Sequence, residues 1–179
     1  MKLPLSYRAL QAEVIITQTV TSMAIISIFF INIGLSQAQI GISQAIFTAM
    51  LLVFNIPFGK LADRYSRRAL NAFGDVLAAS GFIWYFFATS FIEVIIIEML
   101  IGLGLAASLG VDIALMRGYC RKYKLDYKKE SAKIFIIAPI MGVIGMAVAG
   151  FLASINIRLP FLVDASLFAI GALLTIFFK

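Results

Sequence analysis

Histidine is absent from this 179-residue chain, and cysteine occurs once, as Cys120. A lone cysteine excludes a disulfide within the chain, and a structural zinc site lacks its usual ligands. The absence of histidine also removes every enzyme mechanism that needs a histidine base. No other nucleophile and base stand out in the apolar segments. We therefore expect no enzyme activity, no bound metal and no cofactor.

Charged residues are scarce, at 13% of the chain, while 62% of the residues are hydrophobic and the mean hydropathy is +1.01. A soluble domain has about a quarter of its residues charged. Polar side chains are too few to cover a globule of this length, so lipid is the expected surroundings of the apolar surface. A spanning helix needs about 20 mostly apolar residues. The sequence predicts an all-α membrane protein, with residues 1–179 forming a single bundle of six transmembrane helices.

Polar residues divide the apolar sequence into segments. No charged residue occurs from Val14 to Gly59, a stretch too long for one span, and we divide it at residues 36–39. Pro57 is expected to kink the second helix near its end. The predicted helices are residues 10–35, 40–62, 69–90, 92–116, 133–155 and 160–178.

Lysine and arginine are distributed unevenly between the two ends of these helices. Fourteen of the fifteen precede the first helix, follow the sixth, or join helices two to three and four to five. Arg158, between helices five and six, is the exception. Basic loops stay cytoplasmic. We therefore predict a protein of the cell (plasma) membrane with both termini in the cytoplasm. The net charge of +6 is thereby accounted for, and we expect no nucleic-acid partner.

The connection between the second and third predicted helices reads GKLADRYSRR, residues 59–68. On charge alone it is an ordinary basic loop with one acid, Asp63, among arginines that can pair with it or with lipid phosphates. The order of residues resembles the G-x-L-x-D-R-x-G-R-R/K signature of the major facilitator superfamily, in the loop where that family carries it. The matching residues are Gly59, Leu61, Asp63, Arg64, Arg67 and Arg68. Ser66 departs from the usual glycine.

This resemblance implies the N-terminal six-helix bundle of the major facilitator fold, built as a 3+3 inverted repeat. The family normally has about twelve spans, so the C-terminal six-helix half is absent from this sequence. The chain is then a truncated product, a fragment, or a half that pairs with a second six-helix half or another copy. The implied function is alternating-access transport of a small solute in a lipid membrane, with proton coupling as one option. The alternative is a non-transporting membrane scaffold or inert fragment.

The resemblance also implies a conformational clamp at the cytoplasmic face. In the family, the aspartate of the signature caps a helix of the C-terminal half, and the second arginine pairs with an acid late in the fourth helix. Asp63 and Arg67 occupy these positions, and Asp112 is the expected partner of Arg67. Gly59, Arg64 and Arg68 complete the clamp, which would stabilise the outward-open state.

Glu98 is an acid about 9 Å from the middle of the fourth predicted helix. A carboxyl at that depth faces the protein interior or water, not lipid, and is able to carry a coupling proton. Gln18 and Asn32 share a face of the first helix, and in the family the first and fourth helices line the central cavity. We therefore predict a solute or proton pathway formed by Gln18, Asn32 and Glu98. A structural acid is the alternative for Glu98, and the preferred interpretation of Asp75 and Asp164.

Overall fold

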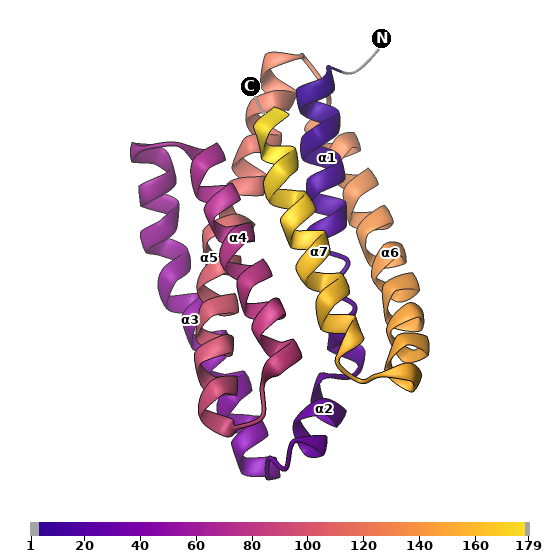
Figure 1. Cartoon of the computed structure of the whole chain (residues 1–179). Helices are drawn as coiled ribbons and strands as arrows, with labels where there is room; N and C mark the ends of the chain where they lie inside the picture. Colours follow the sequence, from indigo (N-terminus) through magenta and orange to yellow (C-terminus); the bar gives the residue numbers. More distant parts are fainter. Residues whose placement is uncertain (1–3, 178–179) are drawn as a thin grey trace.

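The computed structural model describes residues 4–177, and every regular element among them is helical (Figure 1). The α-helices are α1 (Leu5–Thr17), α2 (Ile26–Asn32), α3 (Gln37–Arg64), α4 (Arg67–Phe87), α5 (Phe91–Lys122), α6 (Tyr127–Ile155) and α7 (Leu159–Leu174). Two 3₁₀ turns, η1 (Ser22–Ala24) and η2 (Thr175–Phe177), follow α1 and α7. Lys2, Phe178 and Lys179, which enter the predictions above, lie outside the described residues.

Serine side chains fix the starts of three long helices. Ser36 and Ser90 form capping boxes with Gln39 and Glu93, at the starts of α3 and α5. Ser66 accepts a hydrogen bond from the backbone of Ala69 at the start of α4. These caps satisfy backbone N–H groups that have no partner inside the helix. The helix boundaries therefore fall close to the polar breaks that interrupt the apolar sequence.

The first predicted helix, residues 10–35, is not continuous. α1 ends at Thr17, and the pieces on either side of Ile25 are bent by 42°. The hydroxyl groups of Thr17 and Thr19 bind backbone carbonyls one turn earlier, a pattern that weakens and bends helices. Asp164 of α7 then binds the backbone of the break, so a tertiary contact replaces the helical hydrogen bonds that are lost there.

Four described helices are long and apolar enough to cross a membrane, namely α3, α4, α5 and α6. The bent segment Leu5–Asn32 adds a fifth if it forms one span, and α7 is a shorter apolar helix of 16 residues. The structure thus establishes a helical protein with four or five candidate spans. The count of six spans and the inverted repeat remain predictions.

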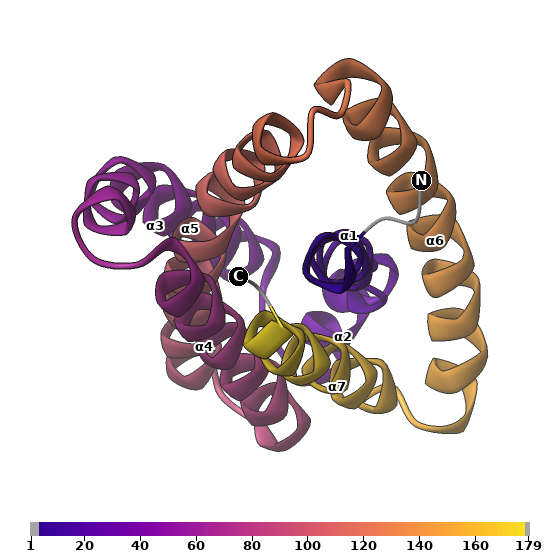
Figure 2. The same cartoon turned by 90° about the horizontal axis from the view of Figure 1, so that it is seen from above.

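The helices pack around α1 (Figure 2). α5 contacts α3 and α4, α4 contacts α7, and α1 contacts α7 and α6. One apolar cluster joins α2, α4, α5 and α7, where Phe161 lies 4.8 Å from Phe29 and 4.9 Å from Tyr85 between ring centroids. A second cluster joins α1, α5 and α6 around Leu10 and Met116. In Figure 1 both ends of the chain lie at the same end of the bundle as the α3–α4 and α5–α6 connections.

Candidate functional site

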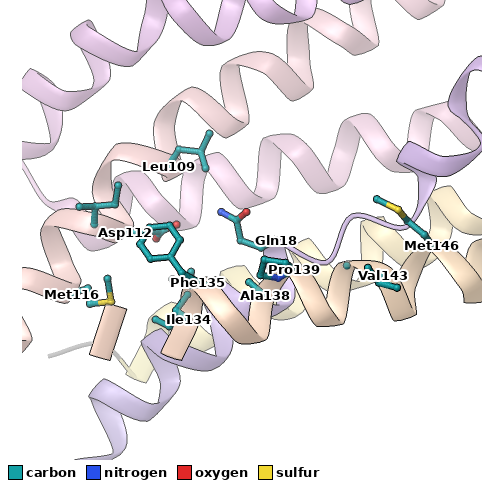
Figure 3. Close-up of a pocket in the computed structure, with 13 residues that line it drawn as sticks. Gln18, Leu109, Asp112, Met116, Ile134, Phe135, Ala138, Pro139, Val143 and Met146 are labelled. Atoms are coloured by element: carbon teal, nitrogen blue, oxygen red, sulfur yellow. The ribbon is translucent and has the colours of Figure 1, made fainter. Parts of the chain in front are cut away.

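A cavity of about 490 Å³ lies between α1, α5 and α6 (Figure 3). That volume is within the range of small-molecule sites, about 300–1,000 Å³. Gln18 and Asp112 supply its polar side chains, from the end of α1 and from α5. Its remaining lining residues are Val14, Leu109, Ile113, Met116, Ile134, Phe135, Ala138, Pro139, Gly142, Val143 and Met146. An apolar chamber with two polar side chains suits a small solute with a large apolar part.

Gln18 reaches the cavity because the first span breaks beside it. It is the C-cap of α1, directly after the last helical residue. Gly145 of α6 packs on the same break, since a Cβ there would lie 3.1 Å from methyl groups of Thr19 and Thr21. The irregular backbone is thus enclosed by protein, which is the condition for such backbone inside a membrane. Discontinuous helices next to a binding site are a recurrent feature of secondary transporters.

Asp112 adjoins three other buried polar side chains. Asn71 of α4 donates a hydrogen bond from Nδ2 to Glu13 Oε1 of α1, at 3.2 Å. The carboxyl of Glu13 also contacts those of Asp75 and Asp112, while Asp112 contacts Asn71. Within residues 4–177, no described ion pair includes any of these three acids. Three carboxyl groups therefore meet inside the bundle, and none of the ion pairs described within these residues neutralises them.

The three residues of the predicted pathway are not brought together. Gln18 lines the cavity, whereas Asn32 is exposed as the last residue of α2. Glu98 is buried between α3, α4 and α5, where it accepts a hydrogen bond from Gln44 Nε2 at 2.9 Å and contacts the Tyr85 hydroxyl. In this conformation Glu98 is an interhelical acid and does not line the cavity.

The signature loop forms the end of α3 and the start of α4. Arg67 donates to Asp63 Oδ1 at 2.7 Å, and both side chains are largely exposed. The expected pairing of Arg67 with Asp112 is not formed here, because Asp112 is buried against Glu13 and Asn71. Gly59 and Arg64 are exposed on the last turns of α3, where a Cβ added to Gly59 meets no atom within 4 Å. Arg68, exposed on α4, has an interaction of its own.

Two of the buried polar residues around Asp112, Glu13 and Asn71, were not among the site residues predicted from the sequence. A signal for Glu13 was available, because it is an acid inside the predicted first helix, 10–35. Its place near the end of that span, about 14 Å from the middle, made it a weaker signal than Glu98. Asn71 lies one turn before Asp75, so helical spacing places the two on one face of α4. The sequence holds no signal that this face meets Glu13.

The fold and the cavity define a multi-pass helical membrane protein with a mostly apolar cavity between its helices. Residues 14–179 match the family model described as Major Facilitator Superfamily, and the chain belongs to this family. Members of the family are transporters and not enzymes. A comparison with curated proteins finds no match to this chain.

Proposed function

We propose that this protein moves a small solute across the membrane by alternating access, and that the solute binds in the cavity between α1, α5 and α6. The cavity is the observation that carries the proposal, because it combines a suitable volume with a mostly apolar lining and two polar side chains. In such transporters the two halves rock about a site near the middle of the membrane. Gln18 and Asp112 would orient the polar end of the solute.

The partner in this motion is a second six-helix half or another copy of the chain. In the most apolar windows of α3 and α6, only 6% and 22% of residues are buried. Apolar faces of this extent need a cover, either lipid or another helical unit. We place the protein in the plasma membrane with both termini cytoplasmic, because the basic connections share one end of the bundle with the termini. Reporter fusions at the C-terminus test that orientation.

The exposed Asp63–Arg67 ion pair supports the proposal of a clamp at this end of the bundle. We propose that Gly59, Arg64, Arg67 and Arg68 face the second half at the cytoplasmic surface. An exposed pair contributes only about 0–1 kcal/mol in isolation, so its importance would lie in the contacts made when the two halves meet. Asp112 would join this clamp only after leaving its contacts with Glu13 and Asn71.

Filling the cavity should stop transport without unfolding the protein. A Cβ added to Gly142 meets no atom within 4 Å, and Gly142 lines the cavity. We therefore expect Gly142→Leu to occupy space where the solute binds and to lower uptake by about tenfold or more, a loss of roughly 1.4 kcal/mol in binding. Proteoliposomes would be incubated with a mixture of small solutes, and their contents measured by mass spectrometry. The second half is supplied if one is required.

Gly150→Leu is the matched control for this experiment. Gly150 lies on the same helix, has equally open space around its Cα, and is not part of the cavity lining. Solute uptake by the Gly150→Leu variant should equal that of the wild type. Equal uptake by the Gly142 and Gly150 variants would remove the cavity as the solute site. If wild-type proteoliposomes accumulate nothing beyond empty liposomes, the scaffold or inert-fragment alternative is favoured.

Glu98 remains a proposed carrier of the coupling proton, although it does not touch the cavity. Its described partners, Gln44 and Tyr85, are neutral, so the carboxyl is free to gain or lose a proton without breaking an ion pair. We expect Glu98→Gln to fold and transport, but with uptake independent of pH. The same uptake assay, run over a pH series, gives the answer. A pH profile like that of the wild type would leave Glu98 a structural acid.

A further inference from the structure

The acids Glu13, Asp75 and Asp112 come from three different helices and meet in the interior. Glu13 and Asp75 are fully buried, and Asp112 is 7% exposed. If all three were ionised, Glu13 Oε2, both oxygens of Asp75 and Asp112 Oδ1 would have no hydrogen-bond donor. Buried ionised carboxylates without donors or counter-charges are among the most costly arrangements in a protein.

The contacts among these carboxyl groups restrict how many of them can be ionised at once. The carboxyl of Glu13 lies in hydrogen-bonding contact with those of Asp75 and Asp112. Two carboxylates only repel at such a distance, whereas a carboxylic acid donates a hydrogen bond to a neighbouring carboxylate. A proton on one member of each contact therefore converts repulsion into a hydrogen bond.

The contacts described between the cluster and its other neighbours within residues 4–177 involve no basic side chain. On α4, Asn71 donates its amide to Glu13, and Arg67 is paired with Asp63. From α7, Gly171 covers Asp75 closely, since a Cβ there would lie 3.0 Å from Asp75 Oδ2. The further charged groups on nearby turns include Arg68 of α4, which has an interaction of its own, and Asp164 of α7, which binds Thr21 and Ser22.

We propose that Glu13, Asp75 and Asp112 form a proton-binding site, in which shared protons hold α1, α4 and α5 together. Asp112 also lines the cavity, so it is the member through which a proton reaches the cluster. Within the described residues, no group of three or more His, Cys, Asp or Glu side chains is arranged to hold a metal ion. The site lies apart from Glu98, and its protonation is measurable without any solute transport.

The test uses the purified full chain in lipid nanodiscs and infrared spectroscopy at neutral pH. Asp75→Asn keeps the shape of a protonated aspartic acid but removes the titrating group, and Glu13→Gln does the same on α1. The wild-type spectrum minus each variant spectrum should contain the carbonyl band of a protonated carboxyl group, which shifts in D₂O. Glu93→Gln is the control, at a partly exposed acid in the first turn of α5, and should leave no such band.

Stability against pH gives a second readout. A proton held in the folded protein and released on unfolding makes stability fall as pH rises. The wild type should therefore melt at a lower temperature at about pH 9 than at about pH 7, and the fall should be at least halved in Asp75→Asn or Glu13→Gln. The Glu93→Gln control should retain the full fall.

Two results would overturn the proposal. The first is the absence of the protonated-carboxyl band from the Asp75→Asn and Glu13→Gln difference spectra, with a pH dependence of melting like that of the wild type. The second is stabilisation of the wild type by sodium chloride relative to choline chloride, lost in Asp75→Asn, because the cluster would then be a sodium site. Transport activity enters neither result, so a failure here leaves the proposed solute cavity untouched.

Discussion

Replacing Asp164 by alanine is expected to cause a large loss of stability. The Asp164 carboxylate accepts hydrogen bonds from Thr21 N at 2.7 Å, Thr21 Oγ1 at 2.7 Å and Ser22 N at 2.8 Å. Hydrogen bonds to a charged group contribute about 1.5–3 kcal/mol each, and buried donors left unpaired cost more. We expect a loss of about 3 kcal/mol or more, equivalent to a fall of roughly 10 °C in the melting temperature.

The measurement is the melting temperature of the purified protein in detergent, followed by circular dichroism. Ser166→Ala is the control on the same helix, because the exposed Ser166 bonds only within its own turn, to Val163 O. It should melt with the wild type. A melting temperature for Asp164→Ala that matches this control would show that the break in the first span does not depend on Asp164.

The Gly104→Ala substitution should separate α4 from α5. A Cβ at Gly104 would lie 2.6 Å from Gly74 O and 2.8 Å from Ala78 N, both of which are backbone atoms of α4. Backbone cannot rotate away as a side chain can, so the helices must move apart. Overpacking of this kind costs about 1–3 kcal/mol, and we expect the upper end of that range. Thermal unfolding measures the change.

Gly118→Ala tests whether steric contact causes the loss of stability expected for Gly104→Ala. Gly118 lies on the same helix, α5, with no atom within 4 Å of an added Cβ. Alanine is the better helix former by about 1 kcal/mol, so this variant should be as stable as the wild type or more stable. If Gly104→Ala were equally tolerated, the close packing of α4 on α5 would not be needed for the fold.

Much of the helical layout could be predicted from the sequence, because charge and capping act locally. Polar residues such as Ser36 and Ser90 stop and start helices within a few residues of themselves. The basic segments beyond Ala62 and Met116 likewise predict the places where helices leave the apolar region. α5 and α6 extend several residues beyond the predicted ends at 116 and 133, because hydropathy marks the lipid boundary and not the helix end.

The break in the first span could not be predicted in the same way. Thr19 and Thr21 disturb neither the hydropathy nor the charge of the segment, and isolated threonines are tolerated within helices. The backbone of the break is bound by Asp164, which is more than 140 residues away in the sequence. Hydropathy identifies Asp164 as an acid at membrane depth but does not identify its partners.

The contacts among Glu13, Asp75 and Asp112 could not be predicted from the sequence either. Attraction between opposite charges favours a pairing of Asp112 with Arg67, and nothing in the sequence favours the approach of Asp112 to Glu13. The contact arises from the packing of α1 against α5, which brings two acidic side chains together. Glu98 is buried, as its depth requires, but its bond to Gln44 depends on how α3 rotates against α5.

The bend of 42° in the first span has a mechanical consequence. An unbroken helix tilts as one rigid body, whereas the two pieces of a bent helix can tilt independently. α1 packs with α5 and α6 in one apolar cluster, whereas α2 packs in the aromatic cluster with Tyr85 and Phe161, so the pieces on either side of the bend have different neighbours. Asp164 of α7 binds Thr21 and Ser22 just before the bend, so a change in the angle between the two pieces would act on α7 as well.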